Sequence, residues 1–301
     1  MVNLPKLRHL HYLVALADEL HFGRAAERCH VSQSALSKGV QELEAGFGVT
    51  LAERTKRQVI ITAPGHEIVA RARRILREAE DMVDLARASG APLSGDLRLG
   101  VIPTVGPYLL PQVMPHLRRD FPELRLYLRE DLTEALIDGL KAGRLDAAIV
   151  ALPFVIDDLA CETLFEDGYM LACARGHPLA NMESVASPEL SGRPMMLLER
   201  GHCLQRHAIS AFEPGDIIED RSFAATSLHT LVAMVEEGLG ITFLPRLAVA
   251  AGIAEGHEIA LVPAPDAAPR KVVMIWRRSS ARAAEFRQLA TALRAASGRA
   301  E

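Results

Sequence analysis

The stretch ERGHCLQRHAIS, residues 199–210, carries a single thiol, Cys203, directly after a glycine and a histidine. Cys203 opens a predicted helix, and the N–H groups at a helix N-terminus lower a thiol pKa and favour the nucleophilic thiolate. The chemistry open to this residue is attack on an oxidant, metal binding or nucleophilic catalysis. The alternative is a buried, inert thiol, which is the most frequent state of a free cysteine.

Metal binding and nucleophilic catalysis by Cys203 would each need further residues that the sequence does not supply. A metal site requires three or four ligands, and only His207, four residues along the same helical face, accompanies Cys203. An enzyme nucleophile requires an oriented base, and His202, as the adjacent residue, points to another side of the helix. We therefore expect no metal, no cofactor and no enzymatic activity.

The composition is typical of a soluble globular protein. The chain has 301 residues, which suggests about two domains, and 49% of them are hydrophobic and 24% charged. No apolar run reaches the roughly 20 residues that span a bilayer, and the N-terminal stretch does not resemble a signal peptide. The four cysteines, Cys29, Cys161, Cys173 and Cys203, contain no C-x-x-C pair. We expect a cytoplasmic protein with free thiols and no membrane partner.

Charge is divided unevenly along the chain, whose net charge is −4. Residues 1–77 hold 12 Lys and Arg against 7 Asp and Glu, whereas the remainder holds 22 against 31. A basic N-terminal part on an acidic body is typical of a head that binds nucleic acid. Chance variation of surface charge is the competing explanation, and the imbalance alone does not decide between the two.

Helical periodicity in residues 1–48 predicts three short helices. Leu7, Leu10 and Leu13 recur at helical spacing, GRAAERC forms a second helix, and Ser32 is placed to cap a third. The third helix is predicted to turn Ala35, Leu36, Val40, Leu43 and Phe47 inward, and Gln33, Ser34, Ser37, Lys38 and Gln41 outward. Two helices joined by a tight turn form a helix-turn-helix. Its outward amides and hydroxyls can read base edges, while the lysine can hold a phosphate.

A two-stranded wing and a long helix are predicted to follow. Arg54, Lys56 and Arg57 precede the β-branched run QVIIT, and we expect this basic tip to contact the phosphate backbone. A helix is predicted from Pro64 onward, with an apolar seam at heptad spacing. The seam consists of Ile68, Ala72, Ile75, Ala79, Met82 and Ala86. It is expected to pair with the same helix of a second subunit, and packing against its own chain is the alternative.

The body of the chain alternates strands with helices. DLRLGVI, ELRLYLRE and LDAAIVAL are predicted strands separated by two helices, and YMLACA, PMMLLE, GITFLP and KVVMIWRR are further strands. Additional helices are predicted around 202–212, 227–238 and 283–296. This alternation of strands and helices predicts a mainly parallel sheet with helices on its faces.

The N-terminal stretch resembles a known family over its whole length. The run LRHLHYLVALADELHFGRAAERCHVSQSALSKGVQELEAGFGVTLAERTKRQVIITAPG is similar to the DNA-binding module of the LysR-type transcriptional regulators. The chain departs from that pattern at Ala52, where an aromatic residue is common. The resemblance implies an α+β multi-domain protein with a winged helix-turn-helix at 1–62, a linker and dimerisation helix at 63–91, and a regulatory domain at 92–301.

The same resemblance implies the architecture and the partners of the regulatory domain. It is expected to consist of two α/β subdomains, about 92–165 plus 267–301 and 166–266, arranged like a periplasmic binding protein with an effector cleft between them. The implied partners are double-stranded promoter DNA, RNA polymerase and further copies of the chain, in a tetramer built as a dimer of dimers.

Several stretches narrow the resemblance to the OxyR family of hydrogen-peroxide sensors. They are GVIPTVGPYLLPQVMPHL, ATSLHTLVAMVEEGLGITFLPRLAV and, most specific, LLERGHCL. The resemblance implies that Cys203 is the thiol attacked by peroxide, with His202, Thr104 and Thr133 as its neighbours. It also implies a second, resolving cysteine nine residues further on, where this chain has Phe212.

The sequence therefore predicts a LysR-type regulator that senses hydrogen peroxide and controls oxidative-stress genes, without the disulfide switch usual in that family. Cys161 and Cys173 could resolve the oxidised thiol only if the fold brings them close, and we expect both, like Cys29, to be inert packing residues. The alternative is a regulator whose cleft binds a small organic effector. Thr104 and the nearby helix N-termini would suit an anionic ligand equally well.

Overall fold

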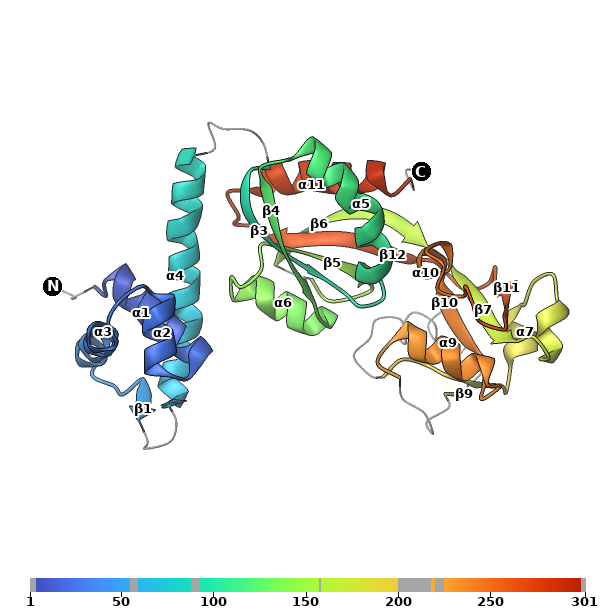
Figure 1. The fold of residues 1–301 in the computed structure, drawn as a ribbon, viewed down its shortest axis with the longest axis horizontal. Coiled ribbons are helices and arrows are strands. Elements are labelled where there is room, and N and C mark those ends of the chain that lie inside the picture. Colours follow the sequence, from blue (N-terminus) through green and yellow to red (C-terminus); the bar gives the residue numbers. More distant parts are fainter. Residues whose placement is uncertain are drawn as a thin grey trace. The chain divides into compact units, whose positions relative to one another are not determined.

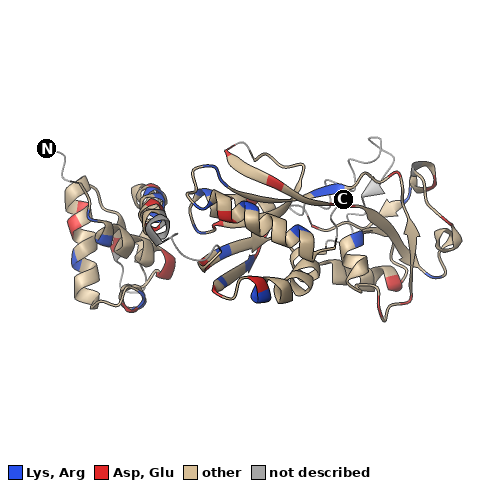
Figure 2. Ribbon diagram, turned by 90° about the horizontal axis from the view of Figure 1, so that it is seen from above, with Lys and Arg blue, Asp and Glu red and all other residues tan. Residues whose placement is uncertain are grey.

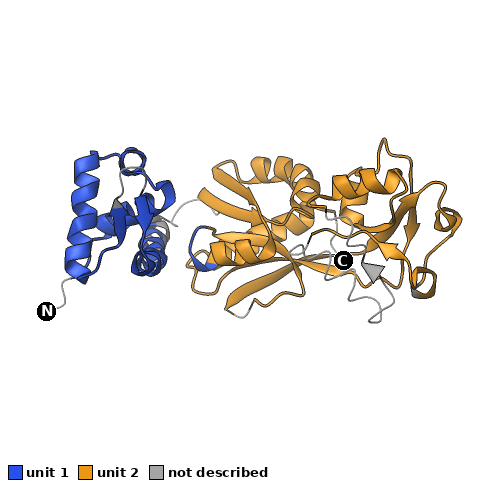
Figure 3. Cartoon of the chain, turned by 90° about the horizontal axis from the view of Figure 1, so that it is seen from below, with its two compact units in different colours: residues 1–90, 141–144 blue, residues 91–140, 145–301 orange. Residues whose placement is uncertain are grey.

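The computed structural model describes residues 4–54, 59–87, 93–156, 158–199, 218–219 and 225–298. The chain divides into two compact units, residues 1–90 with 141–144 and residues 91–140 with 145–301 (Figure 3). Each unit has its own hydrophobic core. None of the helices in the described ranges combines the length and the apolar composition needed to span a membrane.

The first unit is a helix-turn-helix with a two-stranded wing (Figure 1). Its helices are α1 (Leu7–Glu19), α2 (Phe22–Arg28), α3 (Gln33–Phe47) and α4 (Ala63–Arg87), and strands β1 (Ala52–Arg54) and β2 (Val59–Ile61) pair antiparallel. The predicted cap of α3 is confirmed, because the Ser32 hydroxyl accepts a hydrogen bond from the Ala35 N–H at 3.2 Å. The ring of His21 has the same role in α2, where Nδ1 accepts from the N–H groups of Gly23 and Arg24.

Helix α3 packs on α1 through a glycine. It buries Leu36, Gly39, Val40 and Leu43, and a Cβ atom on Gly39 would lie 2.6 Å from the ring of Tyr12. The prediction that Ala35 and Phe47 also face inward is wrong, because both are exposed. Gly39 is buried at this contact although it has no apolar side chain. A pattern of apolar residues therefore cannot predict that this position faces inward.

The two halves of the apolar seam predicted along α4 differ in burial. Ala72 is buried together with Val69 in the core of its own unit, and Ile68 packs against that core. Ile75 and Met82 are 46% and 70% exposed, respectively. The N-terminal half of the seam therefore packs against its own chain, and only the C-terminal half is available to a second subunit.

The second unit contains a five-stranded sheet with the order β4-β3-β5-β12-β6. The strands are β3 (Gly95–Val101), β4 (Leu124–Glu130), β5 (Ala147–Leu152), β6 (Leu159–Asp167) and β12 (Arg270–Arg277), accompanied by helices α5 (Gly106–Asp120), α6 (Thr133–Lys141) and α11 (Ala283–Ala296). β3 pairs in parallel with β4 and β5, but β12 runs antiparallel to both β5 and β6. Because β12 is antiparallel to both of its neighbours, β4, β3, β5 and β6 all run in the same direction. The prediction of a mainly parallel sheet therefore holds for four of the five strands and fails at β12, where the chain returns to this sheet from the opposite direction.

A three-stranded antiparallel sheet, with the order β10-β7-β11, forms the rest of the second unit. Its strands are β7 (Tyr169–Ala174), β10 (Thr242–Pro245) and β11 (Ile259–Pro263), with α7 (Ser187–Leu190), α9 (Leu228–Glu236), α10 (Arg246–Ala250), the 3-10 helix η1 (Pro178–Asn181) and the short parallel pair β8 (Pro194–Met195) and β9 (Ile218–Glu219). The chain crosses between the two sheets twice, at Gly168 and along residues 264–269. The two sheets define a five-stranded and a three-stranded subdomain. The helix predicted around 202–212 lies outside the described residues.

Candidate functional site

Two of the four residues predicted at the peroxide site are described. Cys203 and His202 belong to the segment 201–217, outside the described residues. Thr104 follows β3, and Thr133 begins α6 after β4. Both threonines are 1% exposed.

The sheet register places the two threonines at the same edge. β3 and β4 are adjacent and parallel, and Val101 lies opposite Glu130 at their ends. Thr104 and Thr133 each lie three residues beyond this pair. The carboxyl ends of neighbouring parallel strands are where α/β proteins commonly bind small molecules.

Thr104 is held by an arginine that the sequence analysis did not identify. Arg270 Nη1 donates to the Thr104 hydroxyl at 2.8 Å, and Nη2 donates to the Thr104 carbonyl at 3.0 Å. The hydroxyl oxygen thus accepts from a cation, which fixes its orientation and makes its own O–H a stronger donor.

Arg270 is itself paired with Asp167 in a completely buried ion pair. Its Nε and Nη2 atoms donate to Asp167 Oδ2 at 3.1 and 2.9 Å, and both side chains are 0% exposed. Asp167 Oδ1 accepts from the Leu247 N–H at 2.8 Å. This network joins the end of β6, the start of β12, the segment after β3 and the first turn of α10, and so links the two subdomains. No local signal in the sequence indicated this pair, because Arg270 and Asp167 each lie beside a second charged residue and are 103 positions apart.

Thr133 differs from Thr104 in its surroundings. Within the described part of the chain, its hydroxyl has no hydrogen-bond partner. A buried hydroxyl without a partner costs about 1–3 kcal/mol. Its position in the first turn of α6, a nine-residue helix, adds a partial positive charge. An anionic or oxygen-rich group bound there would satisfy the Thr133 hydroxyl.

The three described cysteines are poor thiolates. Cys173 is buried in β7, as predicted, and burial raises its thiol pKa. Burial also raises the pKa of Cys29, against the opposing charge of Arg28. Cys161 was expected in the core, and that expectation is wrong because it is exposed on β6, the edge strand of its sheet. Its thiol pKa is nevertheless raised, by partial desolvation and then by the carboxylate of Glu162.

These raised pKa values predict slow alkylation at neutral pH. In the Cys203→Ser variant, the thiolate fraction of the remaining cysteines should be below about 1% at pH 7 and should grow about tenfold per pH unit. Labelling by iodoacetamide, followed by peptide mass spectrometry at pH 7 and pH 9, measures this directly. Labelling of Cys29, Cys161 or Cys173 at pH 7 as fast as a small free thiol would contradict the prediction.

The predicted DNA-reading residues lie on one face of α3. Gln33, Ser34 and Lys38 are exposed and Ser37 is half-buried, and the Ser34 hydroxyl lies 3.0 Å from that of Ser32. Arg54 ends β1, whereas Lys56 and Arg57 lie outside the described residues. Residues of both charge signs are spread over both units (Figure 2). The interface is therefore indicated by the exposed polar N-terminal half of α3 rather than by charge alone.

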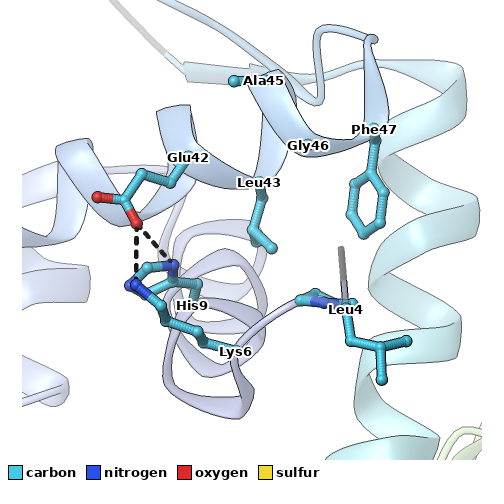
Figure 4. A pocket seen from close by; sticks show the side chains of 9 residues that line it. Leu4, Lys6, His9, Glu42, Leu43, Ala45, Gly46 and Phe47 are labelled. Carbon is cyan, nitrogen blue, oxygen red and sulfur yellow. Dashed lines mark hydrogen bonds and ion pairs between the residues drawn. The ribbon is translucent and has the colours of Figure 1, made fainter. Parts of the chain in front are cut away.

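A small pocket of about 330 Å³ lies between the start of α1 and the C-terminal half of α3 (Figure 4). Glu42 Oε2 lies 3.4 Å from Lys6 Nζ and 3.5 Å from His9 Nδ1. Burial lowers the pKa of His9, and the hydrogen bond from Lys6 lowers the pKa of Glu42. The ion pair therefore neutralises the polar side of a pocket that is otherwise apolar, and the pocket lies beyond the predicted DNA-reading residues.

Two family descriptions match almost the whole chain. Residues 7–66 match "Bacterial regulatory helix-turn-helix protein, lysR family", and residues 90–298 match "LysR substrate binding domain". The chain belongs to the LysR family of regulators. Its winged helix-turn-helix and its regulatory domain of two subdomains, which has the architecture of periplasmic binding proteins, confirm the predicted fold.

Within the LysR family, the chain is similar to OxyR proteins along nearly its entire length. It is 43% identical to the "DNA-binding transcriptional dual regulator OxyR" of Escherichia coli, over 96% of this chain and 95% of that protein. The identity to the regulator EstR of Acinetobacter baylyi is 39%, over 95% of each. Among solved structures, a full-length OxyR cysteine variant of Pseudomonas aeruginosa superposes with a TM-score of 0.82 and 38% identity, covering 97% of this chain and 95% of that one. A Corynebacterium glutamicum OxyR mutant with bound hydrogen peroxide gives a TM-score of 0.66 at 32% identity, covering 98% and 94%.

Proposed function

We propose that this LysR-family regulator senses hydrogen peroxide through oxidation of Cys203 and thereby controls transcription of oxidative-stress genes. The similarity to OxyR proteins supports this function. The observation that carries it is the pair of buried threonines at one sheet edge, Thr104 held by Arg270 and Thr133 with no hydrogen-bond partner among the described residues.

The proposed reaction is a displacement at peroxide oxygen. The Cys203 thiolate attacks one oxygen of hydrogen peroxide, an S–O bond forms and the O–O bond breaks. The second oxygen leaves as hydroxide and takes up a proton to become water, which leaves a sulfenic acid on Cys203. Donors that stabilise the departing oxygen lower the barrier, and this is the role proposed for Thr104, Thr133 and His202.

The fate of the sulfenic acid on Cys203 differs from that in a protein whose second cysteine, in the same segment, would form a disulfide with the first. The chain has Phe212 nine residues after Cys203, and the raised pKa values of Cys29, Cys161 and Cys173 make these thiols weak nucleophiles at neutral pH. We propose that oxidised Cys203 persists as the sulfenic acid or is captured by a small thiol of the cell in a mixed disulfide.

The output is proposed to be a change in how the assembled protein binds promoter DNA. Gln33, Ser34, Ser37 and Lys38 are the proposed base and phosphate contacts, together with the wing residues Arg54, Lys56 and Arg57. The C-terminal half of α4, with the exposed Ile75 and Met82 and the half-buried Ala79, is the proposed contact between subunits of a dimer of dimers. RNA polymerase is the proposed partner at the promoter.

Mass spectrometry of the reduced protein titrated with hydrogen peroxide and trapped with dimedone tests the proposal. We expect a dimedone adduct or a defined disulfide on Cys203 at micromolar peroxide. This product should be absent in Cys203→Ser and unchanged in the matched control Cys161→Ser. Thr133→Val, which keeps the shape and removes the hydroxyl, should slow oxidation of Cys203 by about 100-fold. Peroxide should also change the footprint of the wild-type protein on a promoter fragment selected from genomic DNA.

A folded wild-type protein in which Cys203 remains a thiol would sink the proposal. A small organic effector in the cleft would then be the better function, and ligand-dependent thermal shifts that survive Cys203→Ser would support it.

A further inference from the structure

A second concavity, an open pocket of about 660 Å³, lies in the regulatory unit. Its walls come from α5, from the end of α10 with the turn that follows, and from the C-terminal end of α11. The polar residues that line it are Tyr108, Gln112, Glu255 and Ser297, and prolines and alanines provide the apolar surface. Its volume is within the range of about 300–1,000 Å³ that is typical of small-molecule sites.

The carboxylate of Glu255 is held at this pocket by a glycine turn. The Glu255 N–H donates to the carbonyl of Gly252 at 2.9 Å. Gly252 has a φ of +86°, and a Cβ atom there would lie 2.9 Å from the carboxyl carbon of Glu255. The carboxylate therefore lies directly over a residue that must lack a side chain. The turn places an exposed negative charge at the wall of the pocket.

The other electrostatic features of the pocket have the same sign. Ser297 and Gly298 end α11, a helix of 14 residues, and the C-terminal end of a helix carries a partial negative charge. Burial, and then the charge of Glu130, raises the pKa of Tyr108 to about 12, so its phenol stays protonated and adds no charge to the pocket. Among the described residues that line the pocket, none is Lys or Arg.

We propose that this pocket binds a small organic cation, an aliphatic amine whose ammonium group pairs with Glu255 at the end of α11. The carbon chain of the amine lies on Pro107, Pro111 and Ala250. A carboxylate and a helix C-terminus favour a cation, and the proline and alanine surface favours a short alkyl chain rather than a bare metal ion.

The location gives such a ligand a regulatory consequence. α5 and α11 belong to the five-stranded subdomain, whereas α10 belongs to the three-stranded one. α10 is tied at its start to Asp167, the partner of Arg270. A bound amine contacts both subdomains and stabilises their present arrangement, which includes the position of Thr104. An effect on the peroxide response rests on the function proposed above, but binding itself does not.

Titration calorimetry of the reduced, full-length protein with 1,4-diaminobutane tests the proposal, with 1,4-butanediol as an uncharged probe of similar size. We expect saturable binding of one diamine per chain, a higher melting temperature with diamine present, and no binding of the diol. Glu255→Gln should weaken diamine binding at least tenfold. Glu237→Gln is the matched control, because Glu237 is an exposed glutamate at the end of α9 outside the pocket, and it should bind like the wild type.

Absence of saturable binding by the wild type would overturn the proposal. Equal weakening by Glu255→Gln and Glu237→Gln would also overturn it, because the amine would then be attracted only by the acidic surface. Gly252→Ala is a second test of the site, because the alanine side chain would displace the carboxylate of Glu255. Unchanged affinity for the diamine in a folded Gly252→Ala protein would count against the site. None of these measurements uses peroxide, so their outcome is independent of Cys203.

Discussion

Asp167→Ala is expected to destabilise the regulatory unit by about 3–5 kcal/mol, because it leaves the Arg270 guanidinium buried without its counter-charge. For a unit of this size, that corresponds to a fall of roughly 6–20 °C in melting temperature. The variant also removes the acceptor for the Leu247 N–H and so detaches the first turn of α10. Thermal unfolding followed by circular dichroism measures the effect.

Two further variants test how much of this effect comes from the charge of Asp167. Asp167→Asn removes the charge and keeps one of the two accepting oxygens, so its effect should lie between those of the wild type and Asp167→Ala. Glu166→Ala, at the exposed neighbouring position, should change the free energy of unfolding by less than about 0.5 kcal/mol. If Asp167→Ala unfolds within about 1 kcal/mol of the wild type, the ion pair does not stabilise the joint between the subdomains.

Gly65→Ala is expected to destabilise the first unit. An ideal Cβ on Gly65 would overlap the carbonyl oxygen of Leu51 and lie 2.8 Å from the side chain of Ile61. A backbone oxygen cannot rotate away as a side chain can, so the wing or the start of α4 must move. Overpacking of this kind costs about 1–3 kcal/mol or more. The shift also strains the hydrogen bond from the Gly65 N–H to the Thr62 hydroxyl. We expect lower stability and loss of affinity for promoter DNA.

Gly46→Ala is the matched control for this prediction. Gly46 lies within α3 and a Cβ atom there would meet nothing within 4 Å. Alanine favours a helix by up to about 1 kcal/mol over glycine, so this variant should be as stable as the wild type or more stable. Chemical denaturation of the two variants in parallel, with a mobility-shift assay on DNA, distinguishes a local clash from a general intolerance of glycine substitution. Equal stability of Gly65→Ala and Gly46→Ala would contradict the proposed close contact.

Local signals in the sequence predicted much of the fold. The Ser32 cap, the wing and the helix at 283–296 depend on residues close to one another in the chain, and all three occur in the structure. The predicted strands of the five-stranded sheet are present for the same reason. Thr104 and Thr133 were named through the family resemblance, and the parallel register of β3 and β4 supports their placement at one edge.

The features that the sequence did not reveal depend on long-range contacts. Arg270 and Asp167 are 103 positions apart, so no local pattern links them. Strand β6 was not predicted, and without it Cys161 could not be assigned to the exposed side of an edge strand. The inward assignment of Ala35 and Phe47 failed because both residues lie outside the buried part of α3, which runs from Leu36 to Leu43.

The position of β12 also determines when the regulatory unit can fold during synthesis. β12 pairs with both β5 and β6, yet it is encoded by residues 270–277, after the entire three-stranded subdomain. The ribosome therefore releases this interior strand, which lies between β5 and β6, almost last, and Arg270, the partner of Asp167 and Thr104, emerges with it. Domains fold as units as they emerge. The three-stranded subdomain can form first, whereas a chain that stops before residue 270 lacks both the strand that joins β6 to β5 and the cation that holds Thr104. Incomplete synthesis or premature termination should thus leave the regulatory unit unstable, rather than folded and responding incorrectly to its signal.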